Sequence, residues 1–593
     1  MSSDDSGRTD SSHVESRQID CDLLVVGGGA AGLSAAVTAA YHGLKVIVAE
    51  KADTLGGATA WSGGWMWAPL NPLSQADGIV EDIDAPRTYL KHALGTHFDE
   101  PRVEALLQNA RHMVAFFENK TSLHFVSGSW IADIQGDLPG AGTGGRSVGP
   151  KPFNERRLRK DLRKLVRPQL YETSFLGMGI MAGPDLQAFL HTMTSVRSFL
   201  HAAWRVAFHV LDLIIYRRGM QLVNGPALIA RLVKSADQVG VQMWPSSPVS
   251  SLTIQDGGVT GAVVHRPDGD VTVRASKGVL LAAGGFPNDV ERRAELFPRT
   301  PTGSEHWTLA PKETTGDGID LGESAGGVLD TDLASPAAWC PVSLVPYRNG
   351  RVGVYPHIVD RGKPGLIAVL STGKRFVNEA DGYYQFTQGM LNAAPGNEPV
   401  QAWLICDHKF ERHYPFGMAK PFPVPVFPYV RSGYLTKGKT LWDLAVKCGI
   451  DPAQLVKTVA EFNTHAAAGA DPEFHRGESA FNRGSGDRDH GPNPSLAPVE
   501  QGPFYAIKVL PGSFGTFAGL KADAQSRVLN AQGEPIAGLW VAGSDQANVM
   551  GGHYPSGGIN IGPAMTFGYI AGRQAAGITE YENALPELNN DGV

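Results

Sequence analysis

Glycines near the start of the chain stand at the spacing of a phosphate-binding turn, and an acid follows them. The turn has the pattern G-x-G-x-x-G, at Gly27, Gly29 and Gly32. It joins an apolar run, Leu23–Val26, to an alanine-rich stretch, Ala30–Ala40. A second apolar run, Lys45–Ala49, ends at Glu50, close to the spacing of about 20 residues at which a carboxylate meets a ribose. The order strand, turn, helix, strand and acid predicts a dinucleotide-binding unit.

Each of these residues has its own task. Gly27 permits the tight turn, Gly29 lets the backbone approach a pyrophosphate, and Gly32 lets helix and strand pack closely. The helix that opens the alanine-rich stretch, with Ala31 in its first turn, offers free N–H groups and a positive dipole end to phosphate. Glu50 is then placed to accept hydrogen bonds from the two ribose hydroxyls.

A second glycine-rich loop after Glu50 distinguishes between dinucleotides. Its glycine and polar positions are Lys51, Gly56, Gly57, Thr59, Ser62, Gly63 and Gly64. NAD enzymes of the simple doubly wound type do not need such a loop. The stretch closely resembles flavoproteins of the fumarate reductase and ketosteroid dehydrogenase superfamily, in which the loop runs along the FAD diphosphate toward the isoalloxazine. This resemblance implies bound FAD, and the absence of histidine from the loop implies that the flavin is non-covalent.

The bulk properties exclude several other functions. The chain has 593 residues, a net charge of −7 and 42% hydrophobic residues, which suits two or three packed domains and does not suggest nucleic-acid binding. The four cysteines lie far apart, at Cys21, Cys340, Cys406 and Cys448. They form no C-x-x-C, so neither a metal site nor a disulfide framework is indicated. Because no second G-x-G-x-x-G stands between a strand and a helix, we expect a quinone or dye as electron acceptor in place of a nicotinamide.

The predicted fold is α/β, with a Rossmann-like FAD-binding domain and an inserted α+β catalytic domain. Residues 1–19 are polar and lack the apolar core of a signal peptide, so we predict a disordered tail and expect a cytoplasmic protein. The FAD-binding domain is predicted over residues 20–290, with a helical region at 84–219, and again over residues 511–593. The catalytic domain is predicted over residues 291–510.

Two later apolar strands that close on glycine are expected to return the chain to the cofactor. They are Gly278–Gly285 and Gly538–Gly543. A glycine run then opens a predicted helix, Pro563–Ala576, whose positive N-terminal end would stabilise negative charge on a reduced flavin. The further residues predicted to contact FAD are Val249, Gly284, Gly543, Ile559 and Ile561.

One apolar stretch, Ser195–Tyr216, is open to more than one interpretation. Its polar residues are Arg197, His201, Arg205, His209 and Asp212. They make a membrane span a poor fit, so we expect a helix on the protein surface or over the active site. An amphipathic helix rimmed with arginine also suits the interface of a bilayer, and peripheral membrane contact is therefore an alternative.

A closer resemblance, to the 3-ketosteroid Δ1-dehydrogenases, covers most of residues 20–575. It is strongest in residues 22–69, 365–386 and 538–572. Its most specific part is Tyr554 with Gly558, ahead of an Ile-Gly-Pro-Ala-Met-Thr-Phe run. The resemblance implies an oxidoreductase that introduces a carbon–carbon double bond beside a ketone, as in steroid degradation. The implied substrate is a small hydrophobic ketone, most simply a 3-ketosteroid.

The same resemblance implies roles for individual residues. The Tyr554 hydroxyl and the Gly558 N–H would hold the ketone oxygen, and Tyr383 would remove the adjacent proton. Tyr384 is the alternative base if the match is shifted by one residue. Because the ordinary pKa of tyrosine lies near 10, such a base needs assistance.

In that family a tyrosine from the first half of the chain assists the base. This chain has no tyrosine between Tyr89 and Tyr171. The aromatic residues that could fill the space instead are Phe125, Trp130 and Trp67. Trp65 and Trp67 could either line a large apolar pocket or pack in the core, and the sequence leaves both open.

Two further reactions remain as alternatives. Desaturation of another cyclic ketone, such as an oxo-cyclohexane carboxylate, would retain the two tyrosines and Gly558 but alter the pocket wall. A fumarate reductase-type enzyme would bind a dicarboxylate instead, and its candidate anion ligands here are His357, Arg361 and His553.

Overall fold

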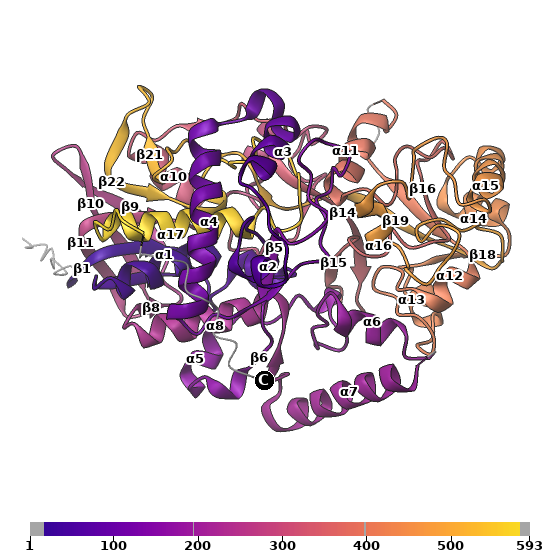
Figure 1. Cartoon of the computed structure of the whole chain (residues 1–593), viewed down its shortest axis with the longest axis horizontal. Coiled ribbons are helices and arrows are strands. Elements are labelled where there is room, and N and C mark those ends of the chain that lie inside the picture. The colour runs from indigo at the N-terminus through magenta and orange to yellow at the C-terminus, as the bar shows by residue number, and fades with distance from the viewer. Residues whose placement is uncertain (1–16, 194, 397–398, 582–593) are drawn as a thin grey trace, which may run out of the picture.

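The computed structural model describes residues 17–193, 195–396 and 399–581. The described chain forms two lobes that lie side by side along the long axis (Figure 1). One lobe is built on an eight-stranded sheet, and the other is built on a seven-stranded sheet.

Five parallel strands make the centre of the eight-stranded sheet. Their order is β22 (Pro535–Val541), β11 (Gly269–Leu281), β1 (Arg17–Val26), β2 (Val46–Ala49) and β8 (Gln242–Trp244). Antiparallel strands extend it: β21 (Arg527–Leu529), β10 (Gly258–Arg266) and β9 (Val249–Gln255). Leu23–Val26 is almost fully buried, which explains its unbroken apolar sequence.

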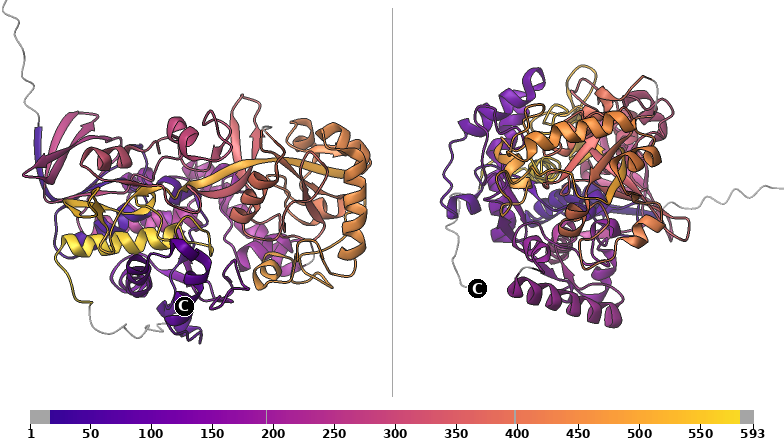
Figure 2. Two further views of the ribbon diagram at one scale, coloured as in Figure 1. Left: turned by 90° about the horizontal axis from the view of Figure 1, so that it is seen from above. Right: turned by 90° about the vertical axis from the view of Figure 1, so that its right-hand side faces the viewer.

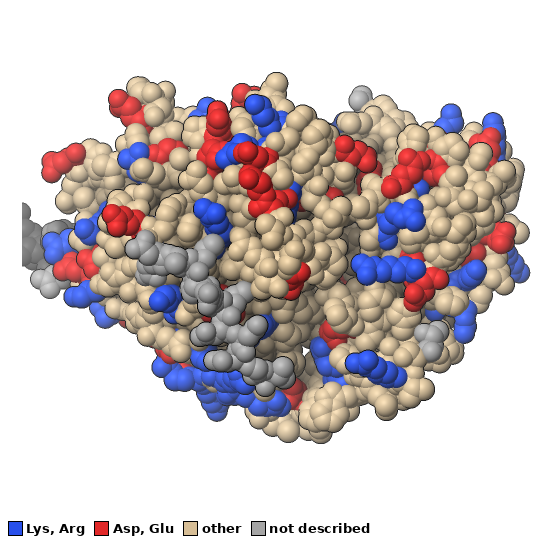
Figure 3. All heavy atoms as spheres, viewed as in Figure 1, with Lys and Arg blue, Asp and Glu red and all other residues tan. Residues whose placement is uncertain are grey.

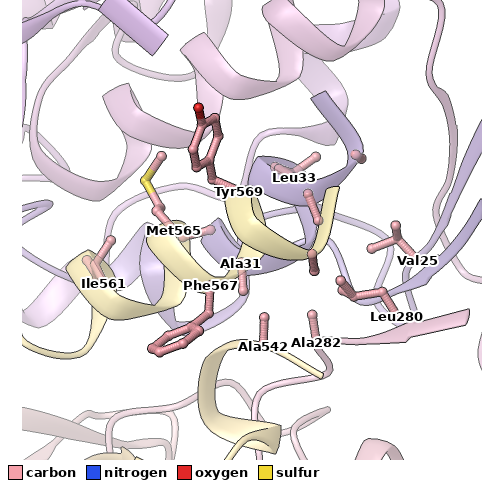
Figure 4. Close-up of a cluster of buried hydrophobic side chains, with 14 of the residues drawn as sticks. Val25, Ala31, Leu33, Leu280, Ala282, Ala542, Ile561, Met565, Phe567 and Tyr569 are labelled. Carbon is pink, nitrogen blue, oxygen red and sulfur yellow. The ribbon is translucent and has the colours of Figure 1, made fainter. Parts of the chain in front are cut away.

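The close contact between α1 (Ala30–Tyr41) and α17 (Ile561–Ala575) anchors the first and last segments of this lobe together. A Cβ added at Gly568 would lie 2.4 Å from the Ala31 carbonyl oxygen, so the two helices meet where only glycine fits. Figure 4 shows Ala31, Ala282 and Ala542 where these helices meet the strand ends. Small side chains there bring the backbone of three separate segments close together.

The second lobe is built around β19 (Phe504–Thr516), a strand of 13 residues. Its sheet has the order β15 (Val352–Pro356), β14 (Ala337–Pro346), β19, β17 (Ala402–Cys406) and β16 (Leu366–Val369), with β12 (Trp307–Thr308) and β18 (Thr436–Gly438) also paired to β19. Seen from above, β19 extends from the second lobe toward the first (Figure 2).

The remaining elements surround these sheets. The helices are α2 (Pro72–Ala76), α3 (Asp84–Leu94), α4 (Glu100–Lys120), α5 (Lys160–Leu165), α6 (Pro184–Leu190), α7 (Val196–Tyr216), α8 (Asn224–Gln238), α9 (Val290–Leu296), α10 (Asp317–Ser324), α11 (Tyr383–Ala393), α12 (His408–His413), α13 (Phe427–Arg431), α14 (Leu441–Cys448), α15 (Pro452–Ala466) and α16 (Ala480–Ser485). The short strands are β3 (Met66–Trp67), β4 (Phe125–Ser127), β5 (Ser147–Pro150), β6 (Phe153–Asn154), β7 (Gln221–Leu222), β13 (Leu329–Asp330) and β20 (Gly519–Leu520).

The prediction of an α/β fold is confirmed, whereas two predicted boundaries are wrong. Residues 17–19 belong to β1 and not to the predicted tail 1–19, of which residues 1–16 lie outside the described residues. The boundary between residues 510 and 511 falls inside β19, whose pairing with β14 runs across it. The division into an FAD-binding domain and an inserted catalytic domain stays a prediction.

Candidate active site

A single continuous cavity of about 1150 Å³ connects the glycine turn to the two tyrosines. Its wall includes Gly27 and Glu50 from the first lobe, and Tyr383 and Tyr554 beyond them. It then continues to α7, where Phe199 forms part of the wall. Its volume exceeds that of ordinary pockets for one small ligand, which measure about 300–1,000 Å³.

The glycine turn leaves open space at the N-terminus of α1. Gly27 has a φ of +107°, and a Cβ there would meet the Ala282 carbonyl oxygen at 2.2 Å. A Cβ built on Gly29 has nothing nearer than the Thr59 hydroxyl oxygen, 4.0 Å away, so the backbone is accessible from the cavity. The turn therefore fits a pyrophosphate at the positive end of α1.

Glu50 is held in place by the backbone on both sides. Its carboxylate accepts hydrogen bonds from the N–H groups of Gly28, at 2.8 Å, and Ala52, at 2.9 Å. Burial raises its pKa above the usual range, and these two hydrogen bonds oppose that shift. A carboxylate has about four acceptor positions, so two bound N–H groups leave room for ribose hydroxyls.

The second glycine-rich loop follows the cavity wall. Gly57 has open space where a Cβ would stand, and the Ser62 hydroxyl donates to the Thr59 carbonyl oxygen at 2.7 Å. Lys51 lies on the wall with its ammonium 2.8 Å from Asp317. Non-glycine residues at Gly64 would collide with Asn224, since a Cβ there meets that carbonyl carbon at 2.7 Å.

Most residues predicted to contact the cofactor share this one wall. They are Gly27, Gly29, Ala31, Glu50, Lys51, Gly57, Thr59, Ser62, Gly63, Gly64, Val249, Gly284, Gly543 and Ile561. Two do not lie on it. Gly32 packs against Gly27, where a Cβ would meet the carbonyl oxygen at 2.0 Å, and Ile559 is buried in the core.

The two tyrosines meet at the far end of this wall. The Tyr383 hydroxyl donates to the Tyr554 hydroxyl oxygen at 2.7 Å, and their rings stand edge to face at 4.9 Å. Asn560 donates to the same Tyr554 oxygen at 3.2 Å. Because that oxygen already accepts two hydrogen bonds, the Tyr554 proton is left to point at a ligand.

Gly558 is on the same wall and has to be glycine. Its φ is +91°, and a Cβ there would lie 2.7 Å from the Trp67 nitrogen. Its carbonyl oxygen accepts hydrogen bonds from Trp67 and Gly562, while its own N–H meets no acceptor within the described part of the chain. A free N–H beside a hydroxyl donor is the arrangement that an oxyanion hole requires.

Burial keeps both hydroxyls protonated at neutral pH. It raises the pKa of Tyr383 well above 10, and the neighbouring Tyr554 adds to the increase. The pKa of Tyr554 is also raised by burial. Arg361, on the same cavity wall, acts in the opposite direction on Tyr383 because its positive charge favours the phenolate.

The structure shows which of the aromatic residues that the sequence left ambiguous line the cavity and which pack in the core. Tyr384 is buried and donates to Ser335, at 2.7 Å, so Tyr383 alone of this pair lies on the cavity wall. Trp67 and Phe125 are fully buried. Trp130 lies on the wall instead.

Trp65 and Trp67 therefore take one role each. The indole of Trp67 donates to Asp133 in the core, at 3.1 Å. Trp65 lies on the cavity wall and packs edge to face on Trp130, with ring centroids 5.6 Å apart.

The three residues of the alternative dicarboxylate site do not converge. His357 is fully buried and binds Asp360, at 2.7 Å, away from the cavity wall. His553 packs near His97 and is also outside the wall. Only Arg361 of this set faces the cavity, so the predicted anion site is wrong as a group.

Sequence reasoning missed other residues of the wall, including Lys420, Asn560 and Phe514. It also missed Asp545, which fixes the cofactor loop at Gly284 by accepting from the N–H groups of Ala283, at 2.5 Å, and Gly285, at 2.7 Å. Burial raises the pKa of Asp545 to about 6. The proximity of Asn560 to the Tyr554 and Gly558 pair was the one available signal.

We predict that Glu50→Ala weakens FAD binding about 10- to 100-fold, because hydrogen bonds to a charged group contribute about 1.5–3 kcal/mol. Titration of the apoprotein with FAD, followed by flavin fluorescence, measures this. Asp53→Ala, which removes an exposed acid outside the cavity wall, is the matched control. An unchanged dissociation constant for Glu50→Ala would contradict the ribose assignment.

Comparison with known proteins agrees with this geometry. The family model described as FAD binding domain matches residues 22–561. The 4-oxocyclohex-2-ene-1-carboxylate 5-dehydrogenase of Sinomonas cyclohexanicum is 42% identical over 564 residues, which cover 95% of each chain. The 3-oxosteroid 1-dehydrogenase of Mycolicibacterium smegmatis is 36% identical over 93% of this chain and 96% of its own.

Among solved structures, the 3-ketosteroid Δ1-dehydrogenase from Sterolibacterium denitrificans, in complex with 1,4-androstadiene-3,17-dione, superposes with a TM-score of 0.87. It is 33% identical, and the match covers 94% of this chain and 100% of that one. This chain therefore belongs to the FAD binding domain family of the fumarate reductase and succinate dehydrogenase flavoprotein superfamily, and it is an FAD-dependent oxidoreductase.

Proposed function

We propose that this enzyme introduces a carbon–carbon double bond beside the carbonyl group of a cyclic ketone, with 3-ketosteroids as its substrate class. The observation that carries the proposal is the hydroxyl pair of Tyr383 and Tyr554, 2.7 Å apart on a cavity wall shared with Gly558 and the cofactor loops. Relatives named for steroid and for cyclohexene carboxylate oxidation support the reaction type.

Tyr554 and Gly558 polarise the ketone. The Tyr554 hydroxyl and the Gly558 N–H both donate to the ketone oxygen, which makes the proton on the adjacent carbon acidic. As that proton leaves, negative charge gathers on the same oxygen and both hydrogen bonds strengthen. Asn560 is a positioning residue, because its hydrogen bond to Tyr554 directs the hydroxyl proton toward the substrate.

Tyr383 takes the proton in its phenolate form, and this transfer restores the hydroxyl that donates to Tyr554. Arg361 favours that charged form, while burial disfavours it. Bound FAD supplies the acceptor for the hydride that leaves the neighbouring carbon. The loss of one proton and one hydride balances the new double bond, and the substrate is oxidised by two electrons.

The chemistry of the wall favours an apolar ketone. The aromatic side chains of Trp65, Trp130 and Phe514 line part of the cavity. Burial of such flat apolar surfaces against a ring system is favourable, at about 25 cal/mol for each Å².

For reoxidation of the flavin we propose a quinone.

A second candidate substrate is a small-ring oxo acid, and Lys420 is the observation that favours it. Lys420 lies on the cavity wall, and its ammonium makes no hydrogen bond to any residue in the described ranges. Burial lowers the pKa of Lys420 to about 8, against the opposing charge of Asp360. A substrate carboxylate could pair with this ammonium.

The first prediction for the proposed reaction concerns the tyrosines. Anaerobic mixing with a 3-ketosteroid should bleach the flavin band. Tyr554→Phe should slow this about 10²- to 10³-fold, since removal of one oxyanion donor costs about 2.7–4 kcal/mol. Tyr383→Phe should abolish it with FAD still bound. Tyr384→Phe is the matched control, and near-normal reduction by Tyr383→Phe would refute the assignment of the base.

The second prediction concerns pH. Because the pKa of Tyr383 is raised above 10, the reactive phenolate is scarce at neutral pH, and each unit of rising pH should speed flavin reduction about tenfold. Arg361→Gln should lower the rate at every pH below the pKa, since it removes the charge that favours the phenolate. Single-turnover stopped-flow measurements test this, and a flat profile between pH 6 and about 9 would contradict it.

The third prediction separates the two substrate classes. Lys420→Met leaves the apolar stem and removes the charge. If 3-ketosteroids are the substrates, flavin reduction by a steroid should change less than about threefold. A 4-oxocyclohexanecarboxylate that reduces the wild-type flavin faster than a steroid, and loses about tenfold or more in Lys420→Met, would establish the oxo acid as the substrate.

A further inference from the structure

Helix α7 has the reverse of the usual amphipathic arrangement. Its polar side chains His201, Arg205, His209 and Asp212 follow one another at helical spacing on one face. That polar face is turned inward, and the buried residues of α7 are Ala202, His209 and Asp212. A helix on the surface of a soluble protein normally buries its apolar face instead.

Specific contacts fix this orientation. Arg205 binds both carboxylate oxygens of Asp185 at 2.8 Å, and the His201 ring lies 2.8 Å from the same group. The His209 ring binds the Leu176 carbonyl oxygen at 2.9 Å. Asp212 forms an ion pair with Arg156 and accepts from the Met220 N–H at 3.0 Å. Rotation of the helix would break all of these contacts, so its apolar face stays outward.

We call this outward face the α7 surface. Its exposed side chains are Val196, Phe199, Leu200, Trp204, Phe208, Leu211, Ile214 and Ile215, and their exposed fractions run from 44% to 77%. The α7 helix is also the one helix in the described chain that is long and apolar enough to cross a membrane. A contiguous apolar surface of this kind marks an interaction site.

A band of basic side chains adjoins the C-terminal end of the α7 surface. We call it the basic rim: Arg157, Arg159, Lys160, Lys164 and Arg217, all of them exposed. Arg218 ties this region to the helix, since it binds the Arg163 carbonyl oxygen at 3.0 Å and Glu155 at 2.9 Å. Figure 3 shows the blue basic atoms gathered at the lower edge, over α5 and the adjacent end of α7.

The acidic residues beside the rim cancel only part of its charge. Glu155 and Asp212 are buried and paired with Arg218 and Arg156. Asp161 and Asp237 both pair with Arg159. The rim therefore presents positive charge on a chain whose net charge is −7.

We propose that the α7 surface and the basic rim together dock the enzyme on the face of an anionic lipid bilayer, with α7 lying in the interface. Apolar side chains beside a basic flank are the combination that binds such interfaces. The polar face of α7 is bound to its own protein, which favours a helix lying flat over one that spans the membrane. A second copy packed on the α7 surface with its α7 parallel would place one basic rim against another, which like charges oppose.

Docking in this orientation would also bring the cavity to the membrane. Phe199 and Ala203 of α7 are exposed and also line the cavity. The same two properties hold for Ile358, Val359 and Phe422. The cavity therefore opens to the outside of the protein next to the α7 surface.

The test is co-sedimentation of the full-length holoenzyme with vesicles, with no substrate present, so that its result is independent of the proposed reaction. Vesicles of phosphatidylcholine are compared with an equal mixture of phosphatidylcholine and phosphatidylglycerol. We expect binding to the mixed vesicles, weakened in about 1 M salt, where electrostatic screening acts within about 3 Å.

Two variants separate the apolar and charged contributions. Trp204→Ser/Ile214→Ser/Ile215→Ser should lower partitioning into mixed vesicles by about 100-fold or more. Arg157→Gln/Lys160→Gln/Lys164→Gln should lower it about 10- to 100-fold. The matched control, Trp442→Ser/Val446→Ser, removes exposed apolar side chains from α14 in the second lobe and should bind as the wild type does.

Flavin absorbance and circular dichroism show whether each variant is folded and loaded. Wild-type protein that fails to sediment with mixed vesicles would overturn the proposal, and so would equal binding by the α7 variant. Sedimentation velocity tests the other occupant. A wild-type dimer that the α7 variant converts to monomer, without vesicle binding, would assign the α7 surface to a second copy of this chain.

Discussion

The position of the proposed base depends on a buried ion network around Glu379. This carboxylate is fully buried and binds Arg375 through both of its oxygens, at 2.7 and 2.8 Å. Arg476 adds a third contact at 3.1 Å, and the Ala368 N–H of β16 donates at 3.0 Å. Arg375 in turn binds Asp471 at 2.7 and 2.8 Å.

This network has a consequence for the active site because Tyr383 follows it by only a few residues. The Glu379 carbonyl oxygen accepts from Arg361 at 2.8 Å, and the Asp381 carbonyl oxygen accepts from the same guanidinium at 3.1 Å. The segment that ends at α11 is thus held from both sides. Removing one member of a buried ion pair costs about 3–5 kcal/mol, so a change in this network would displace the cavity wall at Tyr383 as well as destabilise the fold.

How much the sequence could predict depends on how local each feature is. The glycine turn, Glu50 and the second loop are close in sequence, and their spacing alone indicates the cofactor. Residues 470–500 show the opposite case. Their polar composition predicts a surface loop, yet Asp471 and Arg476 are buried because they bind Arg375 and Glu379. These partners lie nearly 100 positions earlier in the chain, so the local composition could not reveal them.

The same limit applies to the cavity wall. Trp130, Arg361 and Lys420 come from three distant segments, and no local pattern joins them. The choice between Tyr383 and Tyr384 depended on helix geometry. Successive residues of an α-helix point in directions about 100° apart, so only one of the two can face the cavity. It is Tyr383, whereas Tyr384 packs toward Ser335.

The α7 surface and the cavity have to be considered together, because the same helix contributes to both. A small-ring oxo acid is ionised at neutral pH, since free carboxyl groups have a pKa near 4, and it stays in water. It would gain nothing from a cavity that opens onto lipid. A 3-ketosteroid is uncharged and apolar, so it concentrates in a bilayer and reaches the protein from there. If α7 lies in the membrane interface, Phe199 and Ala203 stand where such a ketone would enter, and the outward apolar face of α7 becomes an argument for the larger, uncharged substrate.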